Sequence, residues 1–386
     1  MDRADVVVIG AGIVGLSVAF HLLARDRTLR VVVLDQADYA GAGSTSKATG
    51  GVRRQFGNTL LVRLSQRSIE EYGEFRAITG VDAEFERAGY LLFATSEPGA
   101  RRLLETAALQ HACGSDVAVV GADEIARGWP YLNPEDVRLG TYTAGDGHVN
   151  PYAAVTGYLQ GIRAAGGSVL FGEPVTGIAV EAGRVAGVQT SRRFVPAPVV
   201  VNAAGVRARE VAAMVGQDLP VRPVHTQVAI LTAVPLGVTP VPFTIHVDSG
   251  WYLHHQRDGT ILLGGFQENP GTEEVPDPAV TERFIETGLA RVPRLAEASL
   301  VRAYAGLRAM TPDDLPILGP LPAVPGFFYA CGLGGHGIMH APAVGEAVAR
   351  WILEGTVDAP ELEACRPDRF AARTHTGTQG RESWVL

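Results

Sequence analysis

Three glycines near the start of the chain, Gly10, Gly12 and Gly15, separate a run of apolar residues from an apolar helical pattern. Residues 6–9 are predicted to form a strand buried on both faces, and residues 13–23 a helix with its apolar side toward a sheet. Glycines at this spacing allow a tight turn, close approach of backbone to a pyrophosphate and close helix–strand packing. The helix N-terminus then faces the anion. The chain is therefore expected to begin with a dinucleotide-binding unit.

A second strand and an acidic residue complete this unit. Residues 31–34 are predicted to form a buried strand that ends at Asp35, twenty positions after Gly15. An acid at this place accepts hydrogen bonds from the adenosine ribose hydroxyls. This pattern alone leaves both NAD and FAD open as ligands. The neighbouring positions also expected to contact the cofactor are Ile13, Val14 and Gln36.

Composition limits the partners of the chain. Its formal net charge of −8 argues against a general binder of nucleic acid or anionic membranes, because such proteins carry basic patches. Cys113, Cys331 and Cys365 lie too far apart for a CxxC metal site or a disulfide framework, so we interpret them as reduced thiols of a cytoplasmic protein. No stretch approaches the roughly 20 apolar residues that cross a bilayer. We expect a small ligand, no metal and no transmembrane segment.

The segment 41–56, GAGSTSKATGGVRRQF, favours FAD over NAD. It has no apolar periodicity, and with the preceding motif it resembles the D-amino-acid oxidase family of FAD enzymes, which includes the sarcosine oxidases. In that family the segment wraps the pyrophosphate and the flavin ring. The alternative is a surface loop. The resemblance implies that FAD contacts Gly43, Ser44, Thr45, Lys47, the only lysine of the chain, Gly50 and Gly51.

A second glycine-rich segment, residues 327–355, is predicted to form strand, turn and helix. The chain after residue 355 is short and polar, so this is not a second dinucleotide unit. In the resembled family the matching helix N-terminus points at the flavin C2 carbonyl, where negative charge collects on reduction. His336 is either a packed histidine or a residue at the flavin. The implied FAD contacts are Gly332, Gly334, Gly335, His336, Gly337 and Ile338, together with Val175 on the adenine side, Ala204 and Gly205.

The resemblance extends to about residue 369 and implies a two-layer plan of the α/β class, α+β overall. A Rossmann-like FAD-binding domain is expected over 1–85, 141–215 and 319–370. An interleaved substrate domain with an antiparallel sheet is expected over 86–140 and 216–318, where strand-like runs are broken by turns. The polar tail 371–386 is expected to be mobile.

Arg308, in AGLRAMTPDD, is the principal substrate candidate. In amino-acid-oxidising relatives the matching arginine binds the substrate carboxylate, because a guanidinium fork can hold two oxygens. The alternative is a structural ion pair with Asp313 or Asp314. By resemblance to sarcosine oxidases, a second carboxylate candidate is one of the adjacent pair Arg53 and Arg54, and the residue expected to cover the substrate is Tyr252.

Three departures from the sarcosine oxidases affect the predicted chemistry. Gly306 stands where those enzymes carry the cysteine that attaches FAD, so non-covalent FAD is expected. Leu262 stands where they carry a lysine for reaction with oxygen, so a dehydrogenase that passes electrons to a partner protein or another subunit is expected. Met339 replaces their second substrate lysine, so carboxylate binding would depend on arginine.

The leading hypothesis is oxidation of an amino acid or N-substituted amino acid. The neutral amine would transfer its α-hydride to flavin N5, and the imine would hydrolyse in water. One alternative is a 2-hydroxy-acid or polyol dehydrogenase, which needs a base for the hydroxyl proton. The other is an assembly protein that keeps FAD for structure. The candidate bases are His225, His254, His255 and His336.

Overall fold

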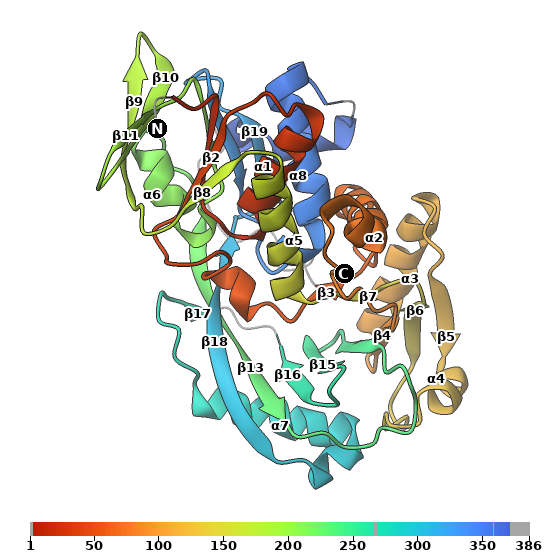
Figure 1. The fold of residues 1–386 in the computed structure, drawn as a ribbon. Helices are drawn as coiled ribbons and strands as arrows, with labels where there is room; N and C mark the ends of the chain where they lie inside the picture. The colour runs from red at the N-terminus through yellow and green to blue at the C-terminus, as the bar shows by residue number, and fades with distance from the viewer. Residues whose placement is uncertain (1–2, 266–268, 358, 371–386) are drawn as a thin grey trace.

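The computed structural model describes residues 3–265, 269–357 and 359–370. Its chain forms two units, each built around one large sheet, and Figure 1 shows them one above the other. The predicted tail 371–386 lies outside the described residues.

The upper unit contains a six-stranded sheet in the order β19-β20-β12-β1-β2-β8. All neighbouring strands are parallel except β19 and β20, which are antiparallel. The strands are β1 (Val6–Ile9), β2 (Val31–Leu34), β8 (Ser168–Leu170), β12 (Val199–Asn202), β19 (Ile317–Pro320) and β20 (Phe327–Cys331). β1 and β2 have the residue ranges that the sequence predicts.

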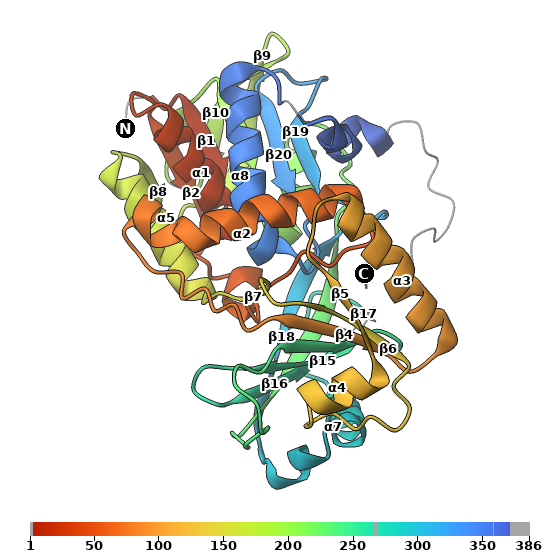
Figure 2. The same ribbon diagram turned by 90° about the vertical axis from the view of Figure 1, so that its right-hand side faces the viewer.

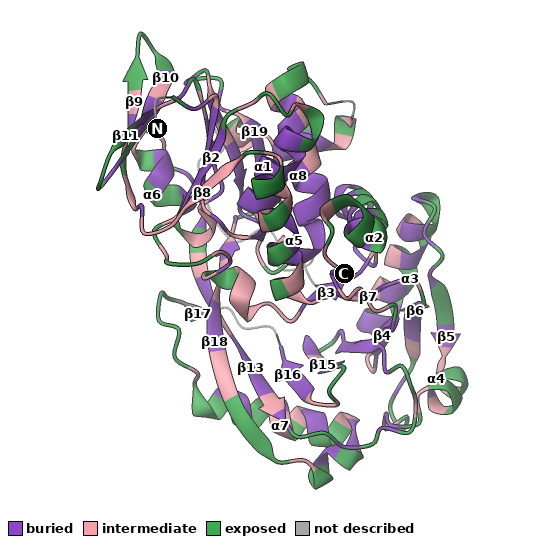
Figure 3. Ribbon diagram, in the orientation of Figure 1, coloured by how far each residue is buried: buried purple, intermediate pink, exposed green. Residues whose placement is uncertain are grey.

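Both faces of this sheet are covered, which explains its unbroken valine runs. Val6 and Val8 face one apolar core, whereas Val7 and Ile9 face another. On the first side lie α1 (Ile13–Arg25), α2 (Thr59–Thr79), α5 (Pro151–Ala164) and α8 (Gly337–Glu354). On the second side lie α6 (Ala208–Ala213) and a three-stranded sheet of β9 (Val175–Glu181), β10 (Arg184–Thr190) and β11 (Phe194–Pro196). Figure 3 shows the buried strands between these layers.

The lower unit contains a nine-stranded sheet in the order β17-β13-β16-β15-β14-β4-β6-β5, with β18 paired to β13. Figure 2 shows this sheet below the helices of the first unit. Its strands are β4 (Tyr90–Ala94), β5 (Ala118–Gly121), β6 (Leu139–Thr143), β13 (Arg222–Leu231), β14 (Phe243–His246), β15 (Trp251–His255), β16 (Ile261–Gly264), β17 (Asn269–Pro270) and β18 (Leu300–Met310). The pairs are antiparallel except β14 with β4.

Strand alternation decides which side chains of this sheet turn toward the first unit. Leu253 and Leu263 pack in a core with α7 (Pro278–Arg291) on the outer face. The residues next to Leu253 and Leu263 along β15 and β16 face the opposite side of the sheet. Here Tyr252 is paired with Gly264, and His254 is paired with Leu262. The inner face therefore presents an aromatic and an imidazole ring.

The predicted domain division remains a prediction, and the two sheets allow its boundaries to be compared with strands. The boundary after residue 140 passes through β6, which belongs wholly to the nine-stranded sheet, and the one after residue 318 passes through β19 of the six-stranded sheet.

The smaller elements are α3 (Glu97–Ala112), α4 (Ala122–Gly128), the pair β3 (Gly51–Val52) and β7 (Gly147–His148), and the 3-10 turns η1 (Ser44–Lys47), η2 (Gly205–Arg207), η3 (Pro293–Glu297), η4 (Pro360–Cys365) and η5 (Pro367–Phe370).

Two properties of the described residues bear on the sequence predictions. Within them no helix combines the length and apolarity needed to span a membrane. The same residues hold no cluster of three or more His, Cys, Asp or Glu suited to a metal ion. The three cysteines are buried thiols.

Candidate active site

The first glycine turn brings backbone atoms so close together that side chains do not fit. A Cβ atom at Gly10 would overlap the Ala203 carbonyl oxygen, and Gly10 has a φ of +111°. A Cβ atom at Gly15 would overlap the Gly10 carbonyl oxygen. A Cβ atom at Gly12, which precedes α1, would lie 3.5 Å from the Thr45 hydroxyl oxygen. The turn therefore brings the N-terminus of α1 directly to the end of β1, and a helix N-terminus in this position is suited to binding a pyrophosphate.

Asp35 lies directly beside this turn at the end of β2. Its carboxylate accepts hydrogen bonds from the backbone N–H groups of Ala11 (2.6 Å) and Ala37 (2.8 Å). These two bonds hold the carboxylate at the carboxyl edge of the sheet, where the ribose of a dinucleotide binds. Gln36 is exposed and accepts a hydrogen bond from Arg207.

The residues expected on the adenine side reach the same edge. The backbone N–H of Glu173 donates to the Asp35 carbonyl (2.9 Å), and Val175 follows at the start of β9. Ala204 and Gly205 follow β12, and the Ala204 Cα lies near the place that a Gly10 side chain would take. The structure thus brings these distant segments together around one turn.

The 41–56 segment joins the two units. The backbone N–H of Ile13 donates to the Thr45 hydroxyl (3.2 Å), and the Ser44 hydroxyl donates to the Leu307 carbonyl in β18 (2.6 Å). Lys47 forms an ion pair with Glu274, and its side chain packs across Gly306, with Cδ 2.9 Å from a Cβ built there. A free surface loop makes no such contacts.

The end of this segment lies against the inner face of the nine-stranded sheet. Gly50 has a φ of +83°, and Gly51 pairs with His148 between β3 and β7. A Cβ atom at Gly51 would overlap the Tyr90 hydroxyl and lie 3.1 Å from the Phe243 ring. Sequence reasoning missed Tyr90 and Phe243. An aromatic residue at the start of each strand was the available signal.

The second glycine turn places the N-terminus of α8 beside the end of β18. Gly332 and Gly334 have φ values of +73° and +54°, and the Gly334 N–H donates to the Ala309 carbonyl (2.9 Å). A Cβ atom at Gly335 would lie 3.1 Å from Nε and 3.2 Å from Cζ of Arg308. Gly337 and Ile338 then begin α8. The turn therefore fixes Arg308 next to the N-terminus of α8.

Arg308 is partly buried on the inner face, near Tyr252. Burial lowers the pKa of the Arg308 guanidinium from its usual value, and Tyr252 opposes this effect. Burial also raises the pKa of Tyr252 to about 12, so the phenol is neutral at pH 7. Of the two carboxylates considered as ion-pair partners, Asp313 pairs with Arg369 at 2.9 and 3.1 Å.

The adjacent arginines point to different surroundings. Arg54 donates to the buried carboxylate of Asp146 (2.7 Å). Arg53 is only 4% exposed, donates to the Gln55 carbonyl and lies 4.1 Å above the centre of the Phe56 ring. Arg53 is therefore the member of the pair that lies among the site residues.

His336 connects the arginines. Its ring packs against Phe56 with centroids 5.0 Å apart. Burial lowers the pKa of His336 well below its usual value, and His340, Arg53 and Arg308 lower it further. The imidazole is therefore neutral at pH 7 and can accept a hydrogen bond. The structure brings together Arg308, Tyr252, Arg53 and His336.

The other candidate bases are less suited to proton transfer. His225 interacts with the Val275 carbonyl (3.0 Å). His254 is buried, stacks on Phe243 with centroids 4.9 Å apart and packs against His148 at 4.5 Å. Burial and two neighbouring histidines hold the pKa of His254 well below its usual value. His255 lies on the opposite side of β15.

The structure also shows where the three positions that differ from the sarcosine oxidases lie. Gly306 lies beneath Lys47, Leu262 is buried opposite His254, and Met339 is buried in the first turn of α8.

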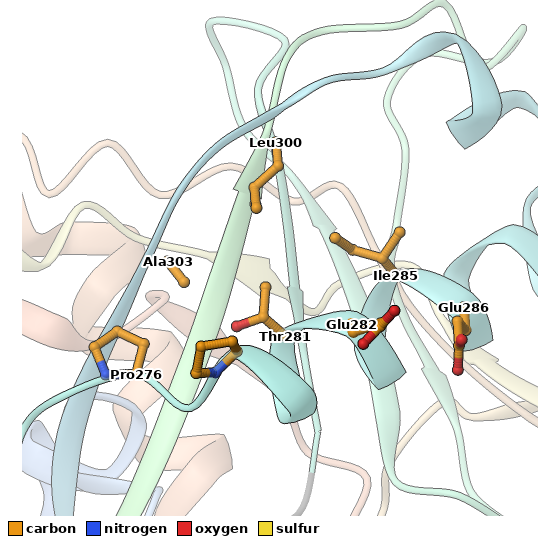
Figure 4. Close-up of a pocket in the computed structure, with 8 residues that line it drawn as sticks. Pro276, Thr281, Glu282, Ile285, Glu286, Leu300 and Ala303 are labelled. Carbon is orange, nitrogen blue, oxygen red and sulfur yellow. The ribbon is translucent and has the colours of Figure 1, made fainter.

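A groove of about 720 Å³ lies elsewhere, between α7 and the start of β18. Figure 4 shows its lining, which contains no predicted site residue.

The two glycine turns, the carboxylate at the edge of the sheet and the site beneath α8 define a flavin-dependent oxidoreductase. The chain belongs to the DAO family, described as FAD dependent oxidoreductase, whose model matches residues 5–351. Its cofactor is FAD, and the glycine turns, Asp35 and Thr45 are the residues that fit it. This confirms the predicted family, fold class and cofactor.

Relatives agree with this assignment. Mitochondrial dimethylglycine dehydrogenase of Mus musculus is 29% identical over 99% of this chain and 46% of its own length. This chain thus spans about half the length of that relative. FAD-dependent oxidoreductase domain-containing protein 1 of Bos taurus is 30% identical over 100% of this chain and 87% of its own. L-proline dehydrogenase from P. horikoshii has a TM-score of 0.90 and 28% identity, covering 96% of this chain and 98% of its own.

Proposed function

We propose that the protein oxidises an amino acid or N-substituted amino acid at the carbon bonded to nitrogen. The observation that carries this proposal is the position of Arg308, packed on Gly335 at the N-terminus of α8 and close to Tyr252. A partly buried guanidinium at this place suits the carboxylate of an amino acid. The names of two relatives, dimethylglycine and L-proline dehydrogenase, also specify amino acids with alkylated nitrogen.

Bound FAD supplies the acceptor for the hydride. The residues of the chain bind and orient the substrate. Arg308 holds the carboxylate, which fixes the α-carbon relative to the N-terminus of α8. Tyr252 covers the substrate from the inner face of the sheet and excludes water.

The amine must be neutral before it can release a hydride. Arg308 and Arg53 both place positive charge in this buried region, and a nearby positive charge lowers the pKa of an ammonium group. The site therefore favours loss of the amine proton without a dedicated base. The same charges act on the hydroxyl of a hydroxy acid, but the pKa of a hydroxyl lies far above that of an ammonium group, so a base must still take its proton. This difference favours the amine as substrate.

The test is anaerobic reduction of the holoenzyme by separate panels of amino acids, N-methyl amino acids and 2-hydroxy acids. Bleaching of the flavin by an amine substrate, with no response to hydroxy acids, supports the proposal. Bleaching by hydroxy acids alone would assign the protein to the alternative enzyme class. FAD that is tightly bound but bleached by no substrate would favour the assembly protein.

A further inference from the structure

Two guanidinium groups approach His336 from different elements. Arg308 comes from β18 and packs on Gly335, the residue before His336. Arg53 comes from the segment after β3 and lies on Phe56, which contacts the His336 ring at 5.0 Å. Both charges act on the His336 imidazole. The site therefore holds two positive groups that belong to separate parts of the fold.

The hydrogen-bond and stacking partners of the Arg53 side chain, the Gln55 carbonyl and the Phe56 ring, are neutral. The buried carboxylate of Asp146 also attracts Arg53, but its direct hydrogen bond is with the adjacent Arg54, so two guanidinium groups share this one carboxylate. Arg53 is only 4% exposed as a residue, so its guanidinium has lost most of its hydration. Burial of a charge is costly unless an anion pairs with it. An anionic group that enters the site from outside would complete this arrangement.

A single carboxylate does not account well for both arginines. One guanidinium fork can bind both oxygens of one carboxylate, and Arg308 is placed to do so. Arg53 is held separately by Phe56 and by the backbone of Gln55. A second carboxylate on the same substrate would give each guanidinium its own anion.

We infer that the substrate is a secondary amine with two carboxylates, an N-carboxyalkyl amino acid. Arg308 binds the carboxylate on the oxidised carbon, and Arg53 binds the carboxylate on the other arm. This inference rests on the proposed function. The oxidised carbon gives a hydride to bound FAD and the nitrogen gives a proton to water. Water then adds to the imine and the carbon–nitrogen bond breaks, which yields a 2-oxo acid and an amino acid.

Binding is tested first, with thioether analogues that cannot form an imine. Thiodiacetate carries two carboxylates and methylthioacetate carries one. Both are titrated into the oxidised holoenzyme and followed by calorimetry and by the flavin absorbance. One additional charged hydrogen-bonding pair is worth roughly a tenfold to hundredfold gain in affinity, so the diacid should bind more tightly by this factor. In Arg53→Met the ratio should fall to about one.

Arg53→Met keeps an apolar side chain over Phe56, and Arg53→Lys keeps the charge and should restore part of the ratio. The control is Arg302→Met, because Arg302 is an exposed arginine on the same strand as Arg308. Its ratio should equal that of wild type. A ratio near one in wild type, or an unchanged ratio in Arg53→Met with FAD bound, would overturn the inference.

Turnover provides the second test. Iminodiacetate and sarcosine differ only in the second carboxylate, and their rates of anaerobic flavin reduction are compared. Faster reduction by the diacid in wild type, lost in Arg53→Met, supports the inference. Equal reduction by both overturns the inference and leaves the proposed function intact. If no amine reduces the flavin, the proposed function fails, and the thioether titration still decides whether Arg53 recognises a second carboxylate.

Discussion

Replacement of Arg308 by alanine tests the proposed carboxylate site most directly. The guanidinium is desolvated, lies against Gly335 and is close to the neutral phenol of Tyr252. A bidentate charged pair in such surroundings is worth about 3 kcal/mol, which corresponds to roughly a hundredfold in kcat/KM. We expect Arg308→Ala to lose this factor and Arg308→Lys to recover part of it, because an ammonium cannot reproduce the planar fork.

The assay is steady-state oxidation of the best substrate with an artificial electron acceptor, and FAD content is measured in the same preparations. Substrate amides or esters serve as the internal control, because they lack the carboxylate charge. They should react about equally with wild type and Arg308→Ala. Full activity of the variant on the free acid, or loss of FAD, would show that Arg308 is structural, and the carboxylate site would then have to be sought at Arg53 or Arg54.

Gly335→Ala examines the same idea without removing the charge. The added Cβ would lie 3.1 to 3.2 Å from Nε and Cζ of Arg308, so the guanidinium has to shift by a few tenths of an ångström. Because Gly335 has no positive φ in this structure, the backbone itself tolerates alanine. We expect a lower kcat/KM for the free acid with little change for the amide. An equal decrease for both substrates would contradict positioning of the carboxylate by Arg308.

Three further results are expected. Acid precipitation should release all of the FAD, because glycine stands at position 306; flavin retained in the pellet would contradict this. Gly10→Ala should abolish FAD binding, because the new Cβ would overlap the Ala203 carbonyl oxygen, and the flavin absorbance of the purified protein checks it. Burial lowers the pKa of His340 from 6.5 to about 3, so unfolding takes up a proton between these pH values and stability falls as the pH decreases. The free energy of unfolding, measured with urea at several pH values, should therefore change with pH less steeply in His340→Gln than in wild type, by about 1 kcal/mol per pH unit.

The oxygen prediction based on Leu262 remains a prediction. Stopped-flow mixing of the reduced protein with air should give reoxidation much slower than reduction of a dye. Leu262 is buried on the inner face opposite His254, so a Leu262→Lys variant would add a charge on that face. Reoxidation in air at the rate of turnover would show that the protein is an oxidase.

Much of the fold could be predicted because it depends on local patterns. The valine strands, the glycines of the first turn and Asp35 are specified by period, spacing and the steric properties of glycine. The predicted strands and helix at the start of the chain match β1, α1 and β2 closely. A pattern of this kind needs no knowledge of distant residues, because each step depends on neighbours in the chain.

The site itself depended more on tertiary contacts. The sequence offered Arg53 and Arg54 as equal carboxylate candidates, and only the position of Asp146, 92 residues after Arg54, separated them. It also placed Lys47 at the cofactor, which remains a prediction, and it did not contain the ion pair of Lys47 with Glu274. Electrostatic pairing follows distance in space, which a linear pattern does not contain.

The sequence by itself determined the family and its cofactor FAD, because the two glycine turns that carry the resemblance are encoded at the residues that adopt them. Only the tertiary structure decided which charged groups lie around His336. Arg308 reaches Gly335 because β18 ends at the turn before α8, and Arg53 reaches His336 through Phe56. The physical reason is that the charge of a site is a sum over neighbours in space, and strand pairing brings those neighbours together from distant parts of the chain.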